Sequence, residues 1–111
     1  MDLRDYQTAA QRTLNVDWPE RDQIANVALG LAGEAGELVD QIKKTLYHGH
    51  PPDRDKIADE LGDCLWYIAA IASKYGLKLD LIADLNISKL WARFPNGFTT
   101  EDSVARVDVG K

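Results

Sequence analysis

Four acidic residues form two matched pairs in the middle of the sequence. Glu34 and Glu37 lie three residues apart in the segment NVALGLAGEAGELVDQIKK, and Glu60 and Asp63 have the same spacing in ADELGDCLWYIAAI. In a helix, a step of three residues returns to nearly the same face, so each pair can hold one cation between its carboxylates. Two such pairs on neighbouring helices would make a four-carboxylate metal site.

The apolar residues around these acids predict two helices, each with one stripe that faces a core. In the first segment they step alternately by four and three residues. That stripe comprises Ile24, Ala28, Leu31, Ala35, Leu38 and Ile42, and the second comprises Ile57, Leu61, Cys64, Ile68 and Tyr75. On a helical wheel, the two acids of each pair lie roughly 80° and 140° from the centre of their stripe, in the same rotational sense. In an antiparallel arrangement, such offsets aim the two pairs either toward each other or apart, and only convergence gives them a shared purpose.

Two glycines lie on the same side of the first helix as its acids. A glycine inside a helix costs about 0.5–1 kcal/mol relative to alanine, so Gly30 and Gly33 need a reason. One interpretation is that bare backbone lets another helix or a ligand approach the carboxylates closely. The alternative is that the acids only make the surface soluble and the glycines are packing contacts. The matched pairs favour the first interpretation.

Turn residues divide the chain into four predicted helices. Asp17 and Pro19 are suited to the start of the second helix, and glycine and proline in HGHPP stop it. The histidines of that turn lack the i, i+4 spacing of a zinc enzyme and indicate a solvated turn. The predicted helices run over residues 2–14, 20–47, 53–75 and 79–94, followed by a short polar tail.

Basic residues and one tryptophan are candidates for binding a phosphorylated ligand. Lys44 lies nearly on the carboxylate face of its helix, whereas Lys43 points elsewhere. Trp18 can either pack against the first turn of the second helix or stack on a nucleobase. On the fourth helix three residues share one face, which predicts a phosphate clamp or, alternatively, an exposed basic strip: Asn86, Lys89 and Arg93.

Composition limits the class of protein. A chain of 111 residues fits one domain, residues 1–111, and its 45% of hydrophobic residues make a marginal core, so we expect a homodimer or homotetramer. The net charge of −5 speaks against a partner that is a nucleic-acid polymer. Cys64, the single cysteine, excludes an internal disulfide. No signal segment, apolar run of membrane-spanning length or lipidation motif is visible, which predicts a cytoplasmic protein without a membrane partner.

The acidic segments resemble a known enzyme family. The strings GLAGEAGELVDQIKK and DELGDCLWYIAAIA resemble the MazG-like branch of the all-α nucleoside triphosphate pyrophosphohydrolases, whose signature is ExxE, a spacer and ExxD. The later NISKLWARFPNGF is similar to the family's Asn/Lys/Arg helix, and the resemblance covers roughly residues 17–106. It implies an all-α fold like a four-helix bundle, in which Glu34, Glu37, Glu60 and Asp63 are the metal-binding and catalytic residues.

The same resemblance implies the activity. The expected reaction splits a nucleoside triphosphate, of a deoxy or non-standard kind, into the monophosphate and pyrophosphate, and a carboxylate such as Glu37 helps to orient or deprotonate the attacking water. Magnesium suits four carboxylates because it prefers oxygen ligands and shares them with substrate phosphates, and manganese is a possible substitute.

Two alternatives compete with this interpretation. A di-iron carboxylate bundle would need Glu-x-x-His on two helices, but the residues three positions after Glu34, Glu37 and Glu60 are all acidic. The second alternative is a non-catalytic helical module that binds a nucleotide or a protein and whose acids only make the surface soluble. Tight magnesium- or manganese-dependent binding of a nucleotide analogue by the wild type but not by Glu60→Gln would exclude that role for the acids.

Overall fold

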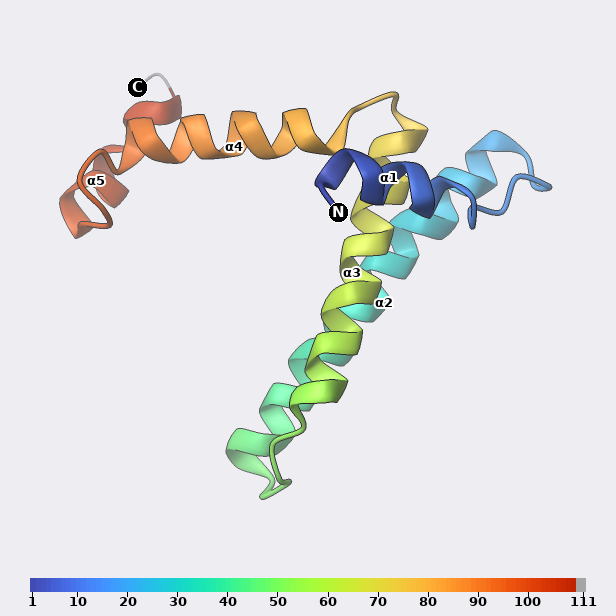
Figure 1. Ribbon diagram of the computed structural model, residues 1–111. Helices are drawn as coiled ribbons and strands as arrows, with labels where there is room; N and C mark the ends of the chain where they lie inside the picture. The colour runs from blue at the N-terminus through green and yellow to red at the C-terminus, as the bar shows by residue number, and fades with distance from the viewer. Residues whose placement is uncertain (110–111) are drawn as a thin grey trace.

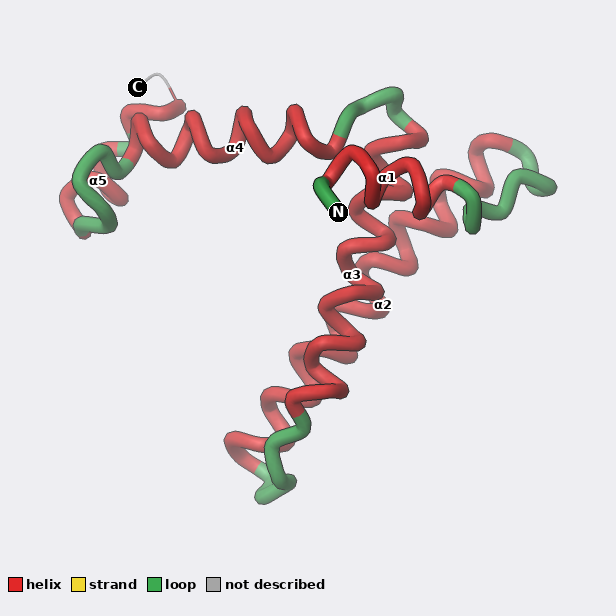
Figure 2. Tube along the Cα trace, in the orientation of Figure 1, coloured by secondary structure: helices red, strands yellow, loops and turns green. Residues whose placement is uncertain are grey.

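The computed structural model describes residues 1–109, which form helices joined by loops and turns (Figures 1 and 2). No strand is present within this range, so the predicted all-α class is confirmed. None of its helices is both long enough and apolar enough to cross a membrane. The elements are α1 (Leu3–Gln11), α2 (Glu20–Tyr47), α3 (Arg54–Lys74), α4 (Leu79–Arg93), α5 (Thr100–Ala105) and the short 3₁₀ helix η1 (Val107–Val109).

The predicted helix bounds agree with these elements except at the first helix, which ends at Gln11, three residues early. Asp53 caps α3 as its carboxylate accepts the backbone N–H of Lys56 at 3.0 Å. The predicted cap of α2 is wrong, because Pro19 is the N-cap residue and no side chain caps the helix. Asp17 stays in the preceding loop, where its own N–H donates to Asn15 Oδ1 at 2.9 Å.

The two long helices α2 and α3 lie side by side as an antiparallel pair (Figure 1). Gly49, with φ of +72°, helps the chain to turn between them, since a residue with a Cβ adopts such a φ only at a cost. At Gly30 the two helices pack so closely that a Cβ there would overlap the aromatic ring of Tyr67 from α3. The expected close approach at Gly30 is therefore present, and the side chain that approaches belongs to α3.

A small hydrophobic core forms where α1 crosses the C-terminal half of α3 (Figure 1). Ala10, Ala69 and Leu79 are its buried members, and larger, partly buried residues pack around them: Leu3, Tyr6 and Trp66. Trp66 Nε1 also donates to Thr13 Oγ1 at 2.7 Å. This core fixes α1 on α3 at one end of the helix pair.

The side chain of Gln7 connects three elements at this junction. Its Nε2 donates to Ser73 Oγ at 3.1 Å and to the carbonyl of Leu77 at 2.9 Å, and its Oε1 accepts the N–H of Leu79 at 2.7 Å. These hydrogen bonds give both polar atoms of the buried Gln7 side chain a partner. Gln7 therefore fixes the turn from α3 into α4 and the direction in which α4 leaves.

Helix α4 extends away from the α2–α3 pair, and its main contacts are with α1, α5 and η1 (Figure 1). The radius of gyration is 17.3 Å, whereas a compact chain of this length would have about 13 Å. Large apolar side chains of α4 are exposed as a result, among them Leu85 at 72% and Trp91 at 65%. Within residues 1–109 the helices therefore do not close a four-helix bundle.

The apolar stripes predicted for α2 and α3 are only partly covered within residues 1–109, and Leu31 and Leu38 are among their half-buried members. Ala28 and Ala35 are exposed on α2, and Leu61 and Ile68 are exposed on α3. The reason is that the two helices meet through the neighbouring face, and α4 does not cover the stripes. The buried residues of α2 are Gln23 and Val27, and those of α3 are Glu60 and three alanines, so polar and apolar side chains are both buried in this pair.

Candidate functional site

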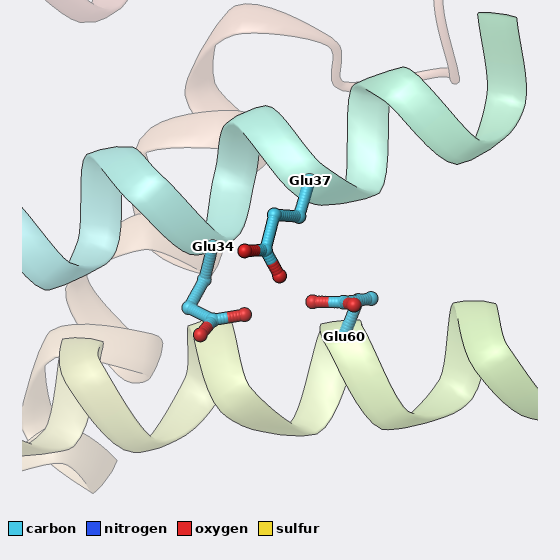
Figure 3. A group of neighbouring side chains, drawn as sticks. All are labelled: Glu34, Glu37 and Glu60. Carbon is cyan, nitrogen blue, oxygen red and sulfur yellow. The ribbon is translucent and has the colours of Figure 1, made fainter.

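Three of the four predicted acids meet between the two long helices (Figure 3). Glu34 and Glu37 come from α2 and Glu60 comes from α3, and one carboxylate oxygen of each lies within 4.8 Å of those of the other two. The predicted convergence of the two helices' acids is therefore present for these three. Like charges at such separations repel one another unless a proton or a cation lies between them.

Glu60 is the most enclosed acid of the cluster, with only 2% of its surface exposed. A carboxylate in such a position needs a compensating charge. Lys56, one turn earlier on α3, supplies one, because its Nζ lies 3.3 Å from Glu60 Oε1. The sequence prediction did not include Lys56, although the i, i+4 spacing between Lys56 and Glu60 was a visible signal.

The environment shifts the pKa values of this cluster in opposite directions. The pKa of Glu34 is raised to about 7, mainly because its carboxyl can share a proton with Glu60, and further by burial and by the charge of Glu37. The pKa of Glu60 is lowered, first by its hydrogen-bonding partner Glu34 and then by Lys56. Near neutral pH, the metal-free cluster therefore holds a proton on Glu34 for part of the time.

The cluster retains unused ligand atoms. Glu34 Oε2 and Glu60 Oε2 are both buried and have no hydrogen-bond partner within residues 1–109. Buried carboxylate oxygens without partners are unfavourable, and a divalent cation with a preference for oxygen ligands would satisfy them. The donor set is all oxygen, so it fits magnesium or manganese better than zinc.

The fourth predicted acid, Asp63, lies outside this group of three. Its side chain is exposed, and it does not offer an oxygen within the 4.8 Å cluster. Its negative charge nevertheless contributes to the raised pKa of Glu34 and to that of the Cys64 thiol, which burial raises first. Asp63 is thus near the cluster but belongs to its exposed side.

The predicted phosphate-binding lysine of α2 is held by a neighbouring carboxylate. Lys44 Nζ lies 3.0 Å from Asp40 Oδ2, and Lys43 Nζ lies 3.3 Å from Asp40 Oδ1. These two pairs hold the pKa of Asp40 below its ordinary value, with Lys44 as the larger cause. Such half-exposed ion pairs contribute little to stability, because solvent screens them.

The other predicted ligand residues lie on elements apart from the acids. Asn86 and Lys89 are exposed on α4, which extends away from the α2–α3 pair (Figure 1). Arg93, at the last position of α4, donates hydrogen bonds to Asp108 of η1. Trp18 is 47% exposed in the loop before α2, where its carbonyl accepts a hydrogen bond from Gln23 at 2.5 Å. The described part of one chain therefore does not bring the basic face of α4 to the carboxylates.

The sequence is similar to a known protein domain and to a phage protein. The domain described as "MazG nucleotide pyrophosphohydrolase domain" matches residues 23–98, which include all four acids and the basic face of α4. The chain is also similar to the "Gene 37 protein" of Mycobacterium phage L5, at 33% identity over 100 residues that cover 83% of this chain and 88% of that protein. No solved structure matches. The chain therefore belongs to the MazG nucleotide pyrophosphohydrolase family.

Proposed function

We propose that this protein hydrolyses a nucleoside triphosphate, of a deoxy or non-standard kind, to the monophosphate and pyrophosphate. The observation that carries the proposal is the cluster of Glu34, Glu37 and Glu60, in which two buried carboxylate oxygens lack a partner. Membership of the MazG family supports a nucleotide as the substrate. A surface that only makes the protein soluble would not bury a glutamate as completely as Glu60.

The three clustered acids, with Asp63 at their exposed side, are the residues that would hold magnesium, or manganese in its place. The ion would supply positive charge that offsets the triphosphate oxygens and makes nearby water more acidic. Glu37 is the exposed member of the cluster and is the candidate to orient or deprotonate the water. Glu60 is buried and paired with Lys56, which suits a fixed ligand rather than a proton acceptor.

Basic residues next to the acids would bind phosphate oxygens. Lys56 lies against the cluster itself, and its side chain is 46% exposed. Its ammonium group can therefore contact a phosphate from solvent while it stays next to Glu60. Lys44, two turns beyond Glu37, can exchange Asp40 for a phosphate group. Each ammonium acts as a point charge, so neither lysine would distinguish between nucleobases.

A second copy of the chain would complete the site. Asn86, Lys89 and Arg93 lie on an extended α4, and its exposed apolar residues require a cover that one chain does not provide. We propose a homodimer or homotetramer in which α4 of one copy packs beside the acid cluster of another. Light scattering at micromolar concentration tests this, and a fully active monomer would contradict it.

The reaction is tested with a panel of nucleoside triphosphates in the presence of magnesium, with chromatography of the products. Release of pyrophosphate and a monophosphate is expected, and exclusive release of orthophosphate would exclude the pyrophosphohydrolase activity. Glu60→Gln should lower turnover at least about tenfold, which corresponds to about 1.4 kcal/mol of barrier. Glu20→Gln, an exposed acid in the first turn of the same helix pair, is the matched control and should leave turnover unchanged.

The same panel tests the roles of the base-binding and phosphate-binding residues. Lys89→Ala should weaken all substrates to similar degrees, because a phosphate contact is common to them. Trp18→Ala should change the ranking of the substrates, because stacking depends on the ring presented. If instead Lys89→Ala changes the ranking and Trp18→Ala has no effect, these two assignments are wrong.

The alternative is a helical module that binds nucleotides or proteins without catalysis. Metal-dependent binding of a non-hydrolysable nucleotide analogue, lost in Glu60→Gln but without turnover of any triphosphate, would favour that alternative.

A further inference from the structure

The C-terminal segment folds back onto the end of α4 and places one carboxylate between two arginines. Arg93 Nε and Arg93 Nη2 donate to the two oxygens of Asp108, each at 2.7 Å. Arg106 Nε lies 3.5 Å from Asp108 Oδ1. We call this arrangement the Arg–Asp–Arg trio. Arg106 and Asp108 lie beyond the residues that match the family domain, so family membership assigns them no role.

Burial differs sharply between the three members of the trio. The side chain of Asp108 is fully buried, whereas the side chains of Arg93 and Arg106 are 18% and 42% exposed. An anion that approaches from solvent therefore meets guanidinium groups and does not meet the carboxylate. Two positive charges and one negative charge leave the trio with a net charge of +1.

The hydrogen bonds of Arg93 leave a usable edge of its guanidinium free. Asp108 occupies the edge formed by Nε and one hydrogen of Nη2. Three of the five N–H donors remain, and they include the edge formed by Nη1 and Nη2, which can bind two oxygens of a phosphate group in parallel. The ring of Phe94, with its centroid 5.6 Å from the guanidinium carbon, further restrains the Arg93 side chain.

The backbone at Arg106 is also held in an unfavourable conformation. Its φ of +51° and ψ of +49° lie in the left-handed region, and it is the one non-glycine residue within 1–109 with a positive φ. A residue with a Cβ keeps such a conformation only where the surroundings determine it, and such residues often occur at functional sites. Here the turn directs Arg106 and Asp108 toward the end of α4.

We propose that Asp108 is a positioning residue that orients the Arg93 guanidinium, and that Arg93 and Arg106 together bind a phosphate group. The identification of this phosphate with the substrate's triphosphate rests on the proposed function. The binding of the anion itself does not. Arg106 is then an additional phosphate ligand, and the tail is part of the binding site of the protein.

Asp108→Asn distinguishes this proposal from a simpler one, because the two predict opposite changes in anion affinity. If Asp108 only neutralises Arg93, removal of its negative charge in Asp108→Asn should tighten anion binding. If Asp108 orients Arg93, the same variant should weaken anion binding although the local charge becomes more positive. An amide cannot accept from Arg93 through both of its polar atoms, so the two-bond contact is lost.

The test uses full-length protein labelled with ¹⁵N-arginine and titrated with inorganic pyrophosphate in the absence of metal and nucleotide, observed by NMR. The Nε–H signals of Arg93 and Arg106 should shift together with one dissociation constant, while those of the exposed Arg12 and Arg54 serve as internal references. Asp108→Asn should raise that constant about fivefold or more, and Arg106→Ala about tenfold, as expected for lost hydrogen bonds between charged groups. Asp108→Glu, which keeps a carboxylate, should recover part of the affinity.

Thr99→Ala controls for loosening of the tail. Thr99 Oγ1 accepts the N–H of Asp102 at 3.0 Å and caps α5, so this variant weakens the tail without a change in the trio. Its pyrophosphate affinity should equal that of the wild type. Unchanged or tighter binding in Asp108→Asn would overturn the proposal, as would an Arg106 signal that does not respond.

The titration remains informative whatever the enzyme assay gives. Pyrophosphate binding at the trio without hydrolysis of any triphosphate would support the anion site and remove only its link to the substrate. Hydrolysis without pyrophosphate binding at the trio would leave the proposed function intact and overturn the role of Asp108.

Discussion

Gly30→Ala is the substitution that tests the close packing of α2 on α3 most directly. The new Cβ would overlap the ring of Tyr67, which already stands edge-on to Trp66 with 5.0 Å between ring centroids. An extra methyl group in a packed position costs about 1–3 kcal/mol. Glu34 follows one turn later on α2, so separation of the helices at Gly30 should also disturb the acid cluster.

Gly33→Ala on the same helix is the matched control, because the new Cβ would have no atom of residues 1–109 within 4 Å beyond its chain neighbours and its own helix backbone. Both variants gain the same helix-propensity term of about 0.5–1 kcal/mol, so the difference between them is the overlap cost alone. Gly33→Ala should therefore unfold at a higher temperature than the wild type, and Gly30→Ala should unfold at least about 4 °C below Gly33→Ala. The measurement is thermal unfolding followed by circular dichroism, at a concentration where both variants have the same mass.

A double variant identifies the side chain responsible. In a Tyr67→Leu background the overlap is removed, so Gly30→Ala should become stabilising, as Gly33→Ala is. Equal stability of Gly30→Ala and Gly33→Ala in the wild-type background would refute the reasoning, since it would mean that Tyr67 moves aside without cost.

The other predictions concern the charges of the acid cluster. At pH 8 without metal, Glu34→Gln should raise the unfolding temperature, because it removes a like charge from the cluster, and it should abolish the stabilisation that magnesium gives the wild type; a melting scan with and without magnesium checks both effects. Since the folded pKa of Glu34 is raised from 4.5 to about 7, its contribution to metal-free stability is fully present below about pH 4.5 and is lost as the pH rises through about 7. Denaturant unfolding at several pH values should therefore show that the free energy of unfolding of the wild type falls with pH between about 4.5 and 7. In Glu34→Gln this fall should be smaller. Lys56→Ala should lower metal-free stability because it leaves the buried Glu60 without its ion pair, whereas Lys43→Ala, which loses only an exposed pair, should not.

The helices were predictable because their signals are local. The apolar periodicity of the long segments and the HGHPP turn lie within a few residues of the features they determine, and the predicted second helix matches α2 at both ends. The cap of α2 was missed because the side chain of Asn15 holds Asp17 in the loop, and a competing contact of that kind is not visible in a list of capping residues.

The arrangement of the helices was not predictable from the same signals. A wheel places Ala28 and Ala35 on an apolar stripe, but it cannot say whether the chain itself covers that stripe. In the structure α2 and α3 meet through the face with the acids, and Gly30 with Tyr67 sets their separation. The stripes are left partly exposed, together with the apolar residues of α4, because α4 makes its main contacts with α1, α5 and η1 and not with the α2–α3 pair.

The acids themselves were predicted as a set of four, and three of them meet. Spacing alone made Asp63 equivalent to Glu60, but a position three residues further along a helix that crosses its neighbour at an angle need not stay in the interface. Lys56 was not predicted, because its position on α3 gains meaning only from the burial of Glu60, which the sequence does not show. A buried carboxylate predicts its counter-charge one turn away, and that inference was available once Glu60 was placed between helices.

The position of the acids is related to the extended shape of the structure and to its exposed apolar side chains. Apolar residues between α2 and α3 would have made that pair a stable core, but a metal site needs oxygen atoms there, and the structure contains no large side chain that is fully buried within residues 1–109. The negative charges of the acid cluster repel one another unless a proton, Lys56 or a cation offsets them. The partly exposed stripes and the extended α4 leave apolar surface in contact with solvent. Burial of this surface against a second copy can supply the stability that the acid cluster does not. On this argument the acid cluster and the proposed assembly both follow from the residues that lie between α2 and α3.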